Sequence, residues 1–217
     1  KEAILLENLV GSDSRWRWNM VNDFRPAYIN STGVKVYPTA NYVDYYGMVN
    51  GLPIKDITVK DTESGYDPEY PWKNRDPRFY KDIIYDGVQC CLNSKGNMKE
   101  DKQYASLYTG GAFRTANGVS SALTGYCITK FVPQLANSYD GYLNNNVLVL
   151  SFMRLSDVYL MYAEATANGY GTPTSTANGF YLTAADAVNK VRDRAGVGHV
   201  ADKYLGSTSD FMSEVRR

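Results

Sequence analysis

The pattern of apolar and polar positions divides the chain into two parts. Residues 1–148 carry short apolar runs that Gly, Pro, Asn and Asp interrupt, whereas residues 149–217 carry long helical periodicity. No segment repeats at a fixed period. We therefore expect a loop-rich mixed segment with short helices and strands, followed by a helix-hairpin segment.

The first long periodic stretch predicts a helix over residues 152–168 that ends at Gly169. Its apolar positions cover a broad face and continue round a second side. Only a narrow stripe of Arg154, Asp157 and Glu164 is strongly polar. We therefore expect this helix to be packed on more than one side.

The carboxylates of this stripe, Asp157 and Glu164, are either catalytic groups or parts of the scaffold. No second acid, nucleophile or aromatic platform converges on them along the sequence. We expect them to stabilise the scaffold by meeting Arg or backbone donors of a neighbouring element, with Arg192 and Arg194 as candidates.

A second helix is expected over residues 184–195, apolar on one side and polar on the other. Thr183 is its expected N-cap, and Gly196 ends it. A third helix begins in "SDFMSEVRR". The first two resemble an antiparallel hairpin of the tetratricopeptide-like kind, with a longer connection than such repeats have.

Shorter elements are expected in the first part of the chain. Thr39 is placed to cap a short helix, and Asn50 with Gly51 supplies the left-handed dihedrals of a two-residue hairpin turn. Asp76 and Pro77 form the pattern of an N-cap followed by proline at the first helical position. The segments "KDIIYDG" and "GYCITKFV" read as strands. The fold is therefore expected to be mainly α, with long loops and a few short strands.

The charge balance excludes some classes of partner. Lys plus Arg equals Asp plus Glu at 23 each, so no basic excess is available to neutralise the phosphates of a nucleic acid.

No apolar run approaches the ~20 residues that span a bilayer. The first residues lack a signal-peptide pattern, so we expect any targeting segment to have been removed or to lie outside this chain.

Nineteen tyrosines and 18 glycines are the unusual feature of the composition. Tyrosine combines a flat apolar face with a polar tip, which suits a half-hydrated surface that grips polar, ring-shaped ligands. A loop-rich fold that uses tyrosine as filler is the alternative.

Cysteine and histidine give little support to catalysis or metal binding. Cys90 and Cys91 are adjacent and rarely bridge, so these thiols and Cys127 are expected to be free and buried. His199 has no Cys or His at ligand spacing, which argues against zinc. The acidic and amide-rich segment 137–146 lacks EF-hand spacing, so calcium is a weak hypothesis. No cofactor and no metal is expected.

The first candidate ligand site is "DSRWRWNMVND". Trp16 and Trp18 point the same way if the segment is extended, and Asn19 lies beside them. Sugar rings present an apolar face and a rim of hydroxyls, so a binder needs an aromatic platform with amide, carboxylate or guanidinium groups nearby. The alternative is that these rings pack beneath a loop.

The second candidate is "SGYDPEYPWKNRD", in which aromatic and polar residues alternate and two prolines reduce the ordering cost of binding. Its candidate ligand-binding residues are Tyr66, Tyr70, Trp72 and Arg75. The alternative is a rigid loop whose aromatics pack against the domain.

Five segments in order resemble the SusD/RagB family of surface nutrient-binding lipoproteins. They are "YPTANYVDYYGMVNGLPI", "RDPRFYKDIIYDG", "TGYCITKF", "RLSDVYLMYAEA" and "AVNKVRDRAGV". Each is weak alone, but their order across residues 37–197 is a strong signal. The family's lipid-bearing cysteine, its amino-terminal helices and a later helix are not visible, so we expect one SusD-like domain truncated at both ends.

The resemblance implies cell-surface binding of an oligosaccharide or polysaccharide on the outer membrane of a Gram-negative bacterium, without catalysis. It also implies delivery to a SusC-like TonB-dependent transporter, and a lipid anchor outside this chain. Some members of the family hold peptides, which is the alternative ligand.

Two other classes of function compete with this interpretation. A glycoside hydrolase needs two carboxylates about 5–5.5 Å apart if it retains configuration, or about 6.5–9.5 Å apart if it inverts it. Asp67 and Glu69, alternate residues on a flexible loop, are a poor precedent for such a pair. A structural scaffold that binds a protein is the third class, and the aromatic loops argue against it.

Overall fold

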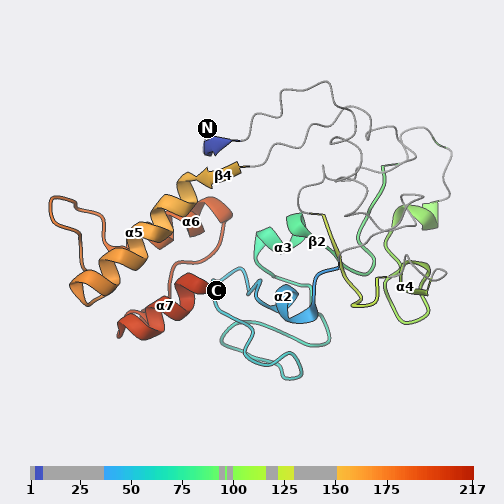
Figure 1. Cartoon of the computed structure of the whole chain (residues 1–217). Coiled ribbons are helices and arrows are strands. Elements are labelled where there is room, and N and C mark those ends of the chain that lie inside the picture. The colour runs from blue at the N-terminus through green and yellow to red at the C-terminus, as the bar shows by residue number, and fades with distance from the viewer. Residues whose placement is uncertain (1–2, 7–36, 93–95, 97–99, 116–121, 130–150) are drawn as a thin grey trace. The chain divides into compact units, whose positions relative to one another are not determined.

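The structure is a computed structural model that describes residues 3–6, 37–92, 96, 100–115, 122–129 and 151–217. These residues form mainly helices and long loops with a few short strands, as the sequence predicts (Figure 1). Within these ranges the strands make two small two-stranded sheets and no closed sheet. No helix in the same ranges has both the length and the apolar character needed to cross a membrane.

The contacts divide the chain into two compact units. The first contains the described residues of Lys1–Glu7, Asp44–Arg78 and Leu150–Arg217, and the second those of Asn8–Val43 and Phe79–Val149. Residues 44–78, part of the loop-rich segment in sequence, thus belong to the same unit as the helices after residue 150. The boundary at residues 148 and 149 therefore describes the change in sequence pattern and differs from the division into compact units.

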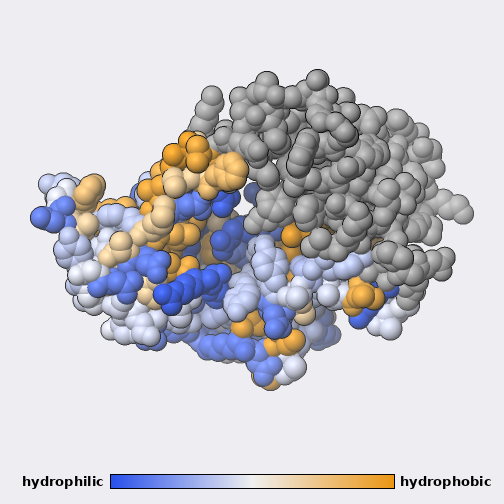
Figure 2. Space-filling model, in the orientation of Figure 1, coloured by the Kyte–Doolittle hydropathy of each residue, from blue (hydrophilic) through white to orange (hydrophobic). Residues whose placement is uncertain are grey.

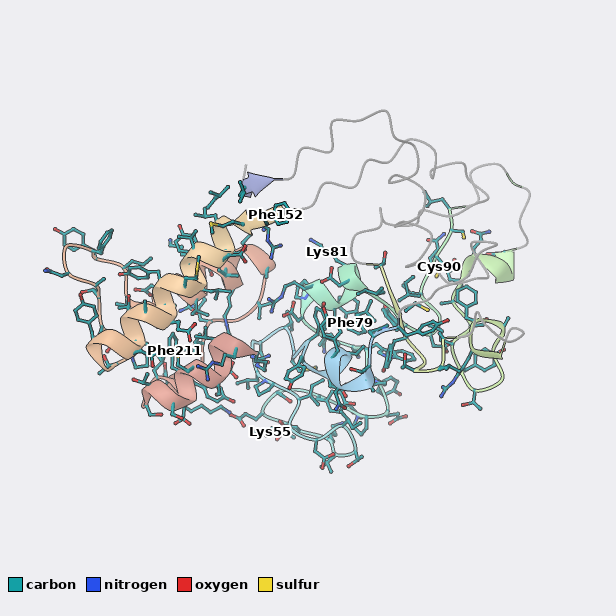
Figure 3. All side chains as sticks on the ribbon, in the orientation of Figure 1. Lys55, Phe79, Lys81, Cys90, Phe152 and Phe211 are labelled. Carbon is teal, nitrogen blue, oxygen red and sulfur yellow. The ribbon has the colours of Figure 1, made fainter. Side chains whose placement is uncertain are left out.

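Three helices build the core of the first unit: α5 (Leu155–Tyr170), α6 (Ala184–Ala195) and α7 (Thr208–Arg216). Small side chains meet between α5 and α6, and Phe211 of α7 lies against them without exposure (Figure 3). The predicted pairing of these two helices is therefore confirmed, and small side chains make the contact. The buried residues of this core are Ala163, Ala167, Ala184, Ala185, Ala187, Val188, Val200, Phe211 and Met212.

Local capping explains where these helices begin and end. The Thr183 hydroxyl accepts a hydrogen bond from the Asp186 backbone N–H at 3.0 Å, and Ser207 caps α7 in the same way. Gly196 takes a left-handed φ of 74° after α6. A 3₁₀ helix, η3 (Asp202–Tyr204), lies between α6 and α7.

The predicted bounds of α5 are wrong at both ends. Residues 151–154 form strand β4 (Ser151–Arg154), which pairs antiparallel with β1 (Ala3–Leu6). The helix starts at Leu155 because Asp157 turns back to accept the Arg154 backbone N–H at 2.7 Å. Gly169 lies inside the helix, and Gly171 ends it with a φ of 84°.

Helix α5 packs against both α6 and α7, as expected of a helix packed on more than one side, but the apolar residues of its outer face are exposed. Leu155 is 42% exposed and Met161 51% exposed. Hydrophobic residues gather over β1, β4 and the start of α5 in Figure 2. The exposed apolar side chains there are Ile4, Leu5, Phe152, Met153, Leu155, Val158 and Met161.

Of the two carboxylates of α5, Glu164 meets an arginine of a neighbouring helix, as expected, although that arginine is Arg216, whereas Asp157 bonds within its own segment. Asp157 caps its own helix, and Glu164 lies 3.5 Å from Arg216 of α7. Arg192, one expected partner, instead forms an ion pair with Glu214.

The two capped helices predicted in the first part of the chain are present. The Thr39 hydroxyl accepts the Tyr42 backbone N–H at 3.2 Å at the start of α2 (Ala40–Asp44). Asp76 accepts the Arg78 backbone N–H at 2.8 Å at the start of α3 (Pro77–Asp82). The predicted hairpin at Asn50 and Gly51 is wrong: among the described residues there, only the glycine has a positive φ and no paired strands flank the turn.

The second unit contains short elements around a small core. Strand β2 (Ile83–Ile84) is shorter than predicted because helix α3 continues through Asp82, and it pairs antiparallel with β3 (Cys127–Ile128). The remaining elements are η1 (Glu100–Gln103) and α4 (Ala112–Thr115). The core residues are Cys90, Cys91, Ala105, Leu107, Phe113, Ala122 and Cys127.

Candidate functional site

A pocket of about 270 Å³ opens within residues 60–74 of the first unit. We call these residues the pocket loop. One aromatic ring on its wall, Tyr70, is exposed, and charged side chains of both signs accompany it. The lining residues are Lys60, Asp61, Thr62, Gly65, Tyr66, Asp67, Tyr70, Lys73 and Asn74.

Side-chain oxygens shape the backbone of the pocket loop. Asp61 pairs with Tyr66 through a backbone hydrogen bond of 3.0 Å, and its Oδ1 accepts the Glu63 N–H at 2.9 Å. Asp67 Oδ1 accepts the Glu69 N–H at 3.1 Å in the same manner. These turns are local and follow from the preference of aspartate to hydrogen-bond the backbone two residues ahead.

Two of the candidate site residues lie under the loop. Tyr66 is 4% exposed and donates its hydroxyl to the Ile57 carbonyl at 3.2 Å. Arg75 is 2% exposed, and its guanidinium donates to the carbonyls of Tyr46 at 2.7 Å and Pro71 at 3.0 Å. A guanidinium bound to carbonyls fixes the backbone that carries the pocket. Both residues therefore hold the loop in place.

The other two candidates present surface to solvent. Tyr70 is 56% exposed, and its hydroxyl donates to Glu69 at 3.2 Å. The Lys73 ammonium lies 5.9 Å from the centre of the Tyr70 ring. Trp72 is half-buried. An exposed ring with amide, carboxylate and ammonium groups around it can stack on an apolar face and bind hydroxyls at the same time.

Ion pairs hold the charged side chains of the loop. Lys60 Nζ lies 2.7 Å from Asp67 Oδ2 across the pocket wall. Hydrogen bonds from Lys60 and the Glu69 backbone hold the pKa of Asp67 below its ordinary value, so this carboxylate is ionised at neutral pH. A general acid for glycoside hydrolysis needs the opposite shift.

A buried cluster of charges, which sequence reasoning missed, anchors the segment before the pocket loop. Arg192 of α6 lies 2.8 Å from Glu214 of α7 and donates to the Gly51 carbonyl at 3.2 Å. Arg217 also binds Glu214, at 2.6 Å, and the Gly51 carbonyl, at 2.7 Å. We call Arg192, Glu214 and Arg217 the arginine clamp. Burial lowers the pKa of Arg192, and the hydrogen bond that Arg192 donates to the Glu214 carboxylate opposes that shift.

Close packing against the arginine clamp explains why residue 51 is a glycine. A Cβ on Gly51 would lie 2.4 Å from the Gly198 carbonyl oxygen and 2.7 Å from Arg192, and the φ of Gly51 is +86°. The segment then reaches the pocket: Val49 donates its N–H to the Asn74 carbonyl at 2.9 Å. The sequence shows the "NG" dipeptide, Arg192 in "VRDRAG" and Arg217 in "EVRR", but it does not show that both arginines contact Gly51.

Neither thiols nor a metal cluster offers other chemistry in the part of the chain that the structure describes. Burial raises the pKa of Cys127 to about 12, and the pKa of Cys90 is raised further, so both are poor nucleophiles. No group of three His, Cys, Asp or Glu side chains could hold a metal within the described ranges.

Some sequence-based candidates lie outside the described residues. They are Trp16, Trp18 and Asn19 of the first candidate site, and the segment 137–146 considered for calcium. They stay predictions.

Comparisons with known proteins place this fold. A SusD-like protein from Bacteroides fragilis superposes with a TM-score of 0.62 at 23% identity, over 100% of this chain and 39% of that chain. A SusD-like carbohydrate binding protein, also from Bacteroides fragilis, superposes with a TM-score of 0.52 at 22% identity, over 82% of this chain and 31% of that one. At these identities the likeness is one of fold.

The chain thus spans less than half the length of these structures. No match was found among curated proteins. The model of the SusD family, however, matches residues 1–217. By that match the chain belongs to the SusD family.

Proposed function

We propose that this protein binds an oligosaccharide or polysaccharide at the pocket loop without breaking bonds. The observation that carries the proposal is the exposed ring of Tyr70 beside the polar groups of Asp67, Lys73 and Asn74 in one pocket. Sugar rings offer C–H faces to such a ring, and their hydroxyls both donate and accept hydrogen bonds.

Family membership supports the same ligand class. One structural relative is described as a carbohydrate binding protein. In our proposal the bound glycan is handed to a SusC-like TonB-dependent transporter, and the protein is held at the outer membrane surface of a Gram-negative bacterium by a lipid anchor. A peptide is the alternative ligand.

Rigidity of the loop supports binding rather than chemistry. The carbonyl contacts of Arg75 and the paired turns at Asp61 and Asp67 fix the wall of the pocket before a ligand arrives. The ion pair with Lys60 and the lowered pKa of Asp67 disfavour the general-acid role that a glycosidase would require of it, which supports binding without catalysis.

The test combines a binding and a hydrolysis measurement on the same glycans. Calorimetric titration against a panel of polysaccharides is expected to show binding, and a reducing-sugar assay on the same mixtures is expected to show no increase in reducing ends. Release of reducing ends would overturn the claim that bonds stay intact. Binding to a peptide library with no binding to any glycan would favour the peptide alternative.

A further inference from the structure

The connection between α5 and α6 presents a second aromatic surface, far along the chain from the pocket loop. Residues 171–183 form this connection, which extends to one side of the helix pair (Figure 1). Tyr181 is 99% exposed and Phe180 63% exposed, and Tyr170 at the end of α5 is 53% exposed. Adjacent exposed apolar residues that form a patch, unlike single exposed ones, are candidates for an interaction site.

Hydrogen bonds hold this connection in one conformation. The Tyr162 hydroxyl donates to the Leu182 carbonyl at 2.6 Å and accepts the Ala177 N–H at 3.3 Å. The Tyr170 hydroxyl accepts the Asn178 N–H at 3.1 Å. At the other end, Thr208 of α7 donates to the Gly171 carbonyl at 2.9 Å. A fixed backbone reduces the ordering cost of binding through the exposed rings.

The chemistry around the rings is polar but uncharged. Residues 165–185 contain no Asp, Glu, Lys, Arg or His, in a chain in which 21% of residues are charged. Exposed hydroxyl and amide side chains accompany the rings, namely Thr172, Thr174, Thr176 and Asn178. The Phe180 ring is also steadied by an edge contact with Tyr162, with the ring centres 6.1 Å apart.

We infer that Phe180 and Tyr181 form a second contact surface for a neutral glycan. Aromatic faces match the C–H faces of sugar rings, and the threonine hydroxyls and the Asn178 amide match sugar hydroxyls. The absence of charge selects against uronate or sulfate groups, which need a cation. The choice of a glycan rests on the proposed function, whereas the surface itself is independent of the pocket loop.

Two other occupants fit the observations less well. A stable protein interface takes roughly 20–30 residues a side, more than the 13 residues of 171–183 supply. Segments that lie on lipid headgroups carry Lys or Arg beside their aromatics, and this connection has none. A polysaccharide needs only a few exposed rings.

Affinity electrophoresis of the Phe180→Ala/Tyr181→Ala variant tests the inference. Gels contain amylopectin, mannan or arabinoxylan as neutral glycans, or polygalacturonate as an anionic one. The apparent dissociation constant for a neutral glycan that retards the wild type is expected to rise about threefold to tenfold in the variant. Phe152→Ala, which removes a ring that is 64% exposed on β4, is the matched control and is expected to behave as wild type.

The outcomes separate this inference from the proposed function. Equal retardation of wild type and double variant overturns the second surface and leaves glycan binding at the pocket loop standing. A wild type that no glycan retards overturns both. Flotation with phosphatidylcholine vesicles that depends on these two rings, with unchanged retardation, assigns them to a lipid surface and also overturns the inference. The single variant Tyr181→Ala repeats the test without touching the Tyr162–Phe180 contact.

Discussion

Two regions of the first unit are held together by different interactions. The helices α5, α6 and α7 meet through alanines, Val188 and Phe211, with apolar contact as the main attraction. The segment from Gly47 to Asp76, which includes the pocket loop, has few buried apolar side chains. It is held by carbonyl contacts of Arg75 and by the arginine clamp.

The difference shows how an irregular loop can be rigid and still leave its rings exposed. Arg75 and the clamp use backbone carbonyls as anchors, so Tyr70 is not needed to fill a core and stays 56% exposed. Among α5, α6 and α7, by contrast, the apolar side chains themselves make the contact between the helices, so they are buried. The connection between α5 and α6 is also held by a side chain that binds the backbone, because the Tyr162 hydroxyl donates to the Leu182 carbonyl. The connection's own ring, that of Tyr181, is exposed.

Removing the carboxylate of the clamp is expected to have the largest effect. Glu214→Ala leaves the buried guanidinium of Arg192 and that of Arg217 without the carboxylate they share, so the free energy of unfolding should fall by about 3–5 kcal/mol. Urea denaturation measures this loss. The matched control is Glu164→Ala, whose ion pair with Arg216 is exposed and should contribute less than about 1 kcal/mol. Equal losses in the two variants would show that the clamp does not anchor the segment.

Overpacking the helix layer is expected to have a smaller effect. Ala163 is fully buried between α5 and its neighbours, and Ala163→Leu should lower the free energy of unfolding by about 1–3 kcal/mol. Ala165 is exposed on the same helix, so Ala165→Leu should change stability little. If the two variants unfold at the same urea concentration, the small-residue contact is not tightly packed.

Loosening the α5–α6 connection is expected to have a smaller effect again. Tyr162→Phe removes the hydroxyl that binds the Leu182 carbonyl and the Ala177 N–H, which should lower the free energy of unfolding by about 1 kcal/mol. Tyr181→Phe is the control, because that side chain is 99% exposed and should contribute nothing measurable. Stability unchanged in Tyr162→Phe would argue that these hydrogen bonds are not formed in solution.

Acid should loosen the turns of the pocket loop before it affects the helices. Hydrogen bonds hold the pKa values of Asp61 and Asp67 below their ordinary 3.8. Their stabilising effect is therefore present above pH 3.8 and is lost as the pH falls through the lowered values. Amide exchange, corrected for its intrinsic pH dependence, should rise at Glu63 and Glu69 below that pH, with no change in α6, whose cap is the hydroxyl of Thr183. Equal loosening of both regions would contradict the comparison.

Local signals predicted much of the fold. The caps at Thr39, Asp76 and Thr183 each depend on a hydrogen bond within three residues, which the sequence can specify. The end of α5 was harder, because Gly169 and Gly171 offer the same signal and the hydrogen bond from Gly171 to Ala167 decides between them.

Long-range contacts explain what sequence could not predict. Gly51 and Arg192 are 141 residues apart, and nothing local indicates that the guanidinium binds that carbonyl. Periodicity showed that α5 is apolar on several sides, but it could not show which side would meet α6 and which would face solvent. For the proposed site, the sequence indicated the segment around Tyr70, which stays a prediction, whereas the burial of Tyr66 and Arg75 follows only from the packing.

Calorimetric titration of the Tyr70→Ala variant with a glycan that binds the wild type tests the central claim most directly. Tyr45→Ala is the matched control, since Tyr45 is 62% exposed in the same unit and does not line the pocket. We expect affinity to fall about tenfold in Tyr70→Ala, with unchanged urea denaturation, and to stay at the wild-type value in Tyr45→Ala. Wild-type affinity in Tyr70→Ala would contradict the assignment of the pocket loop as the glycan site.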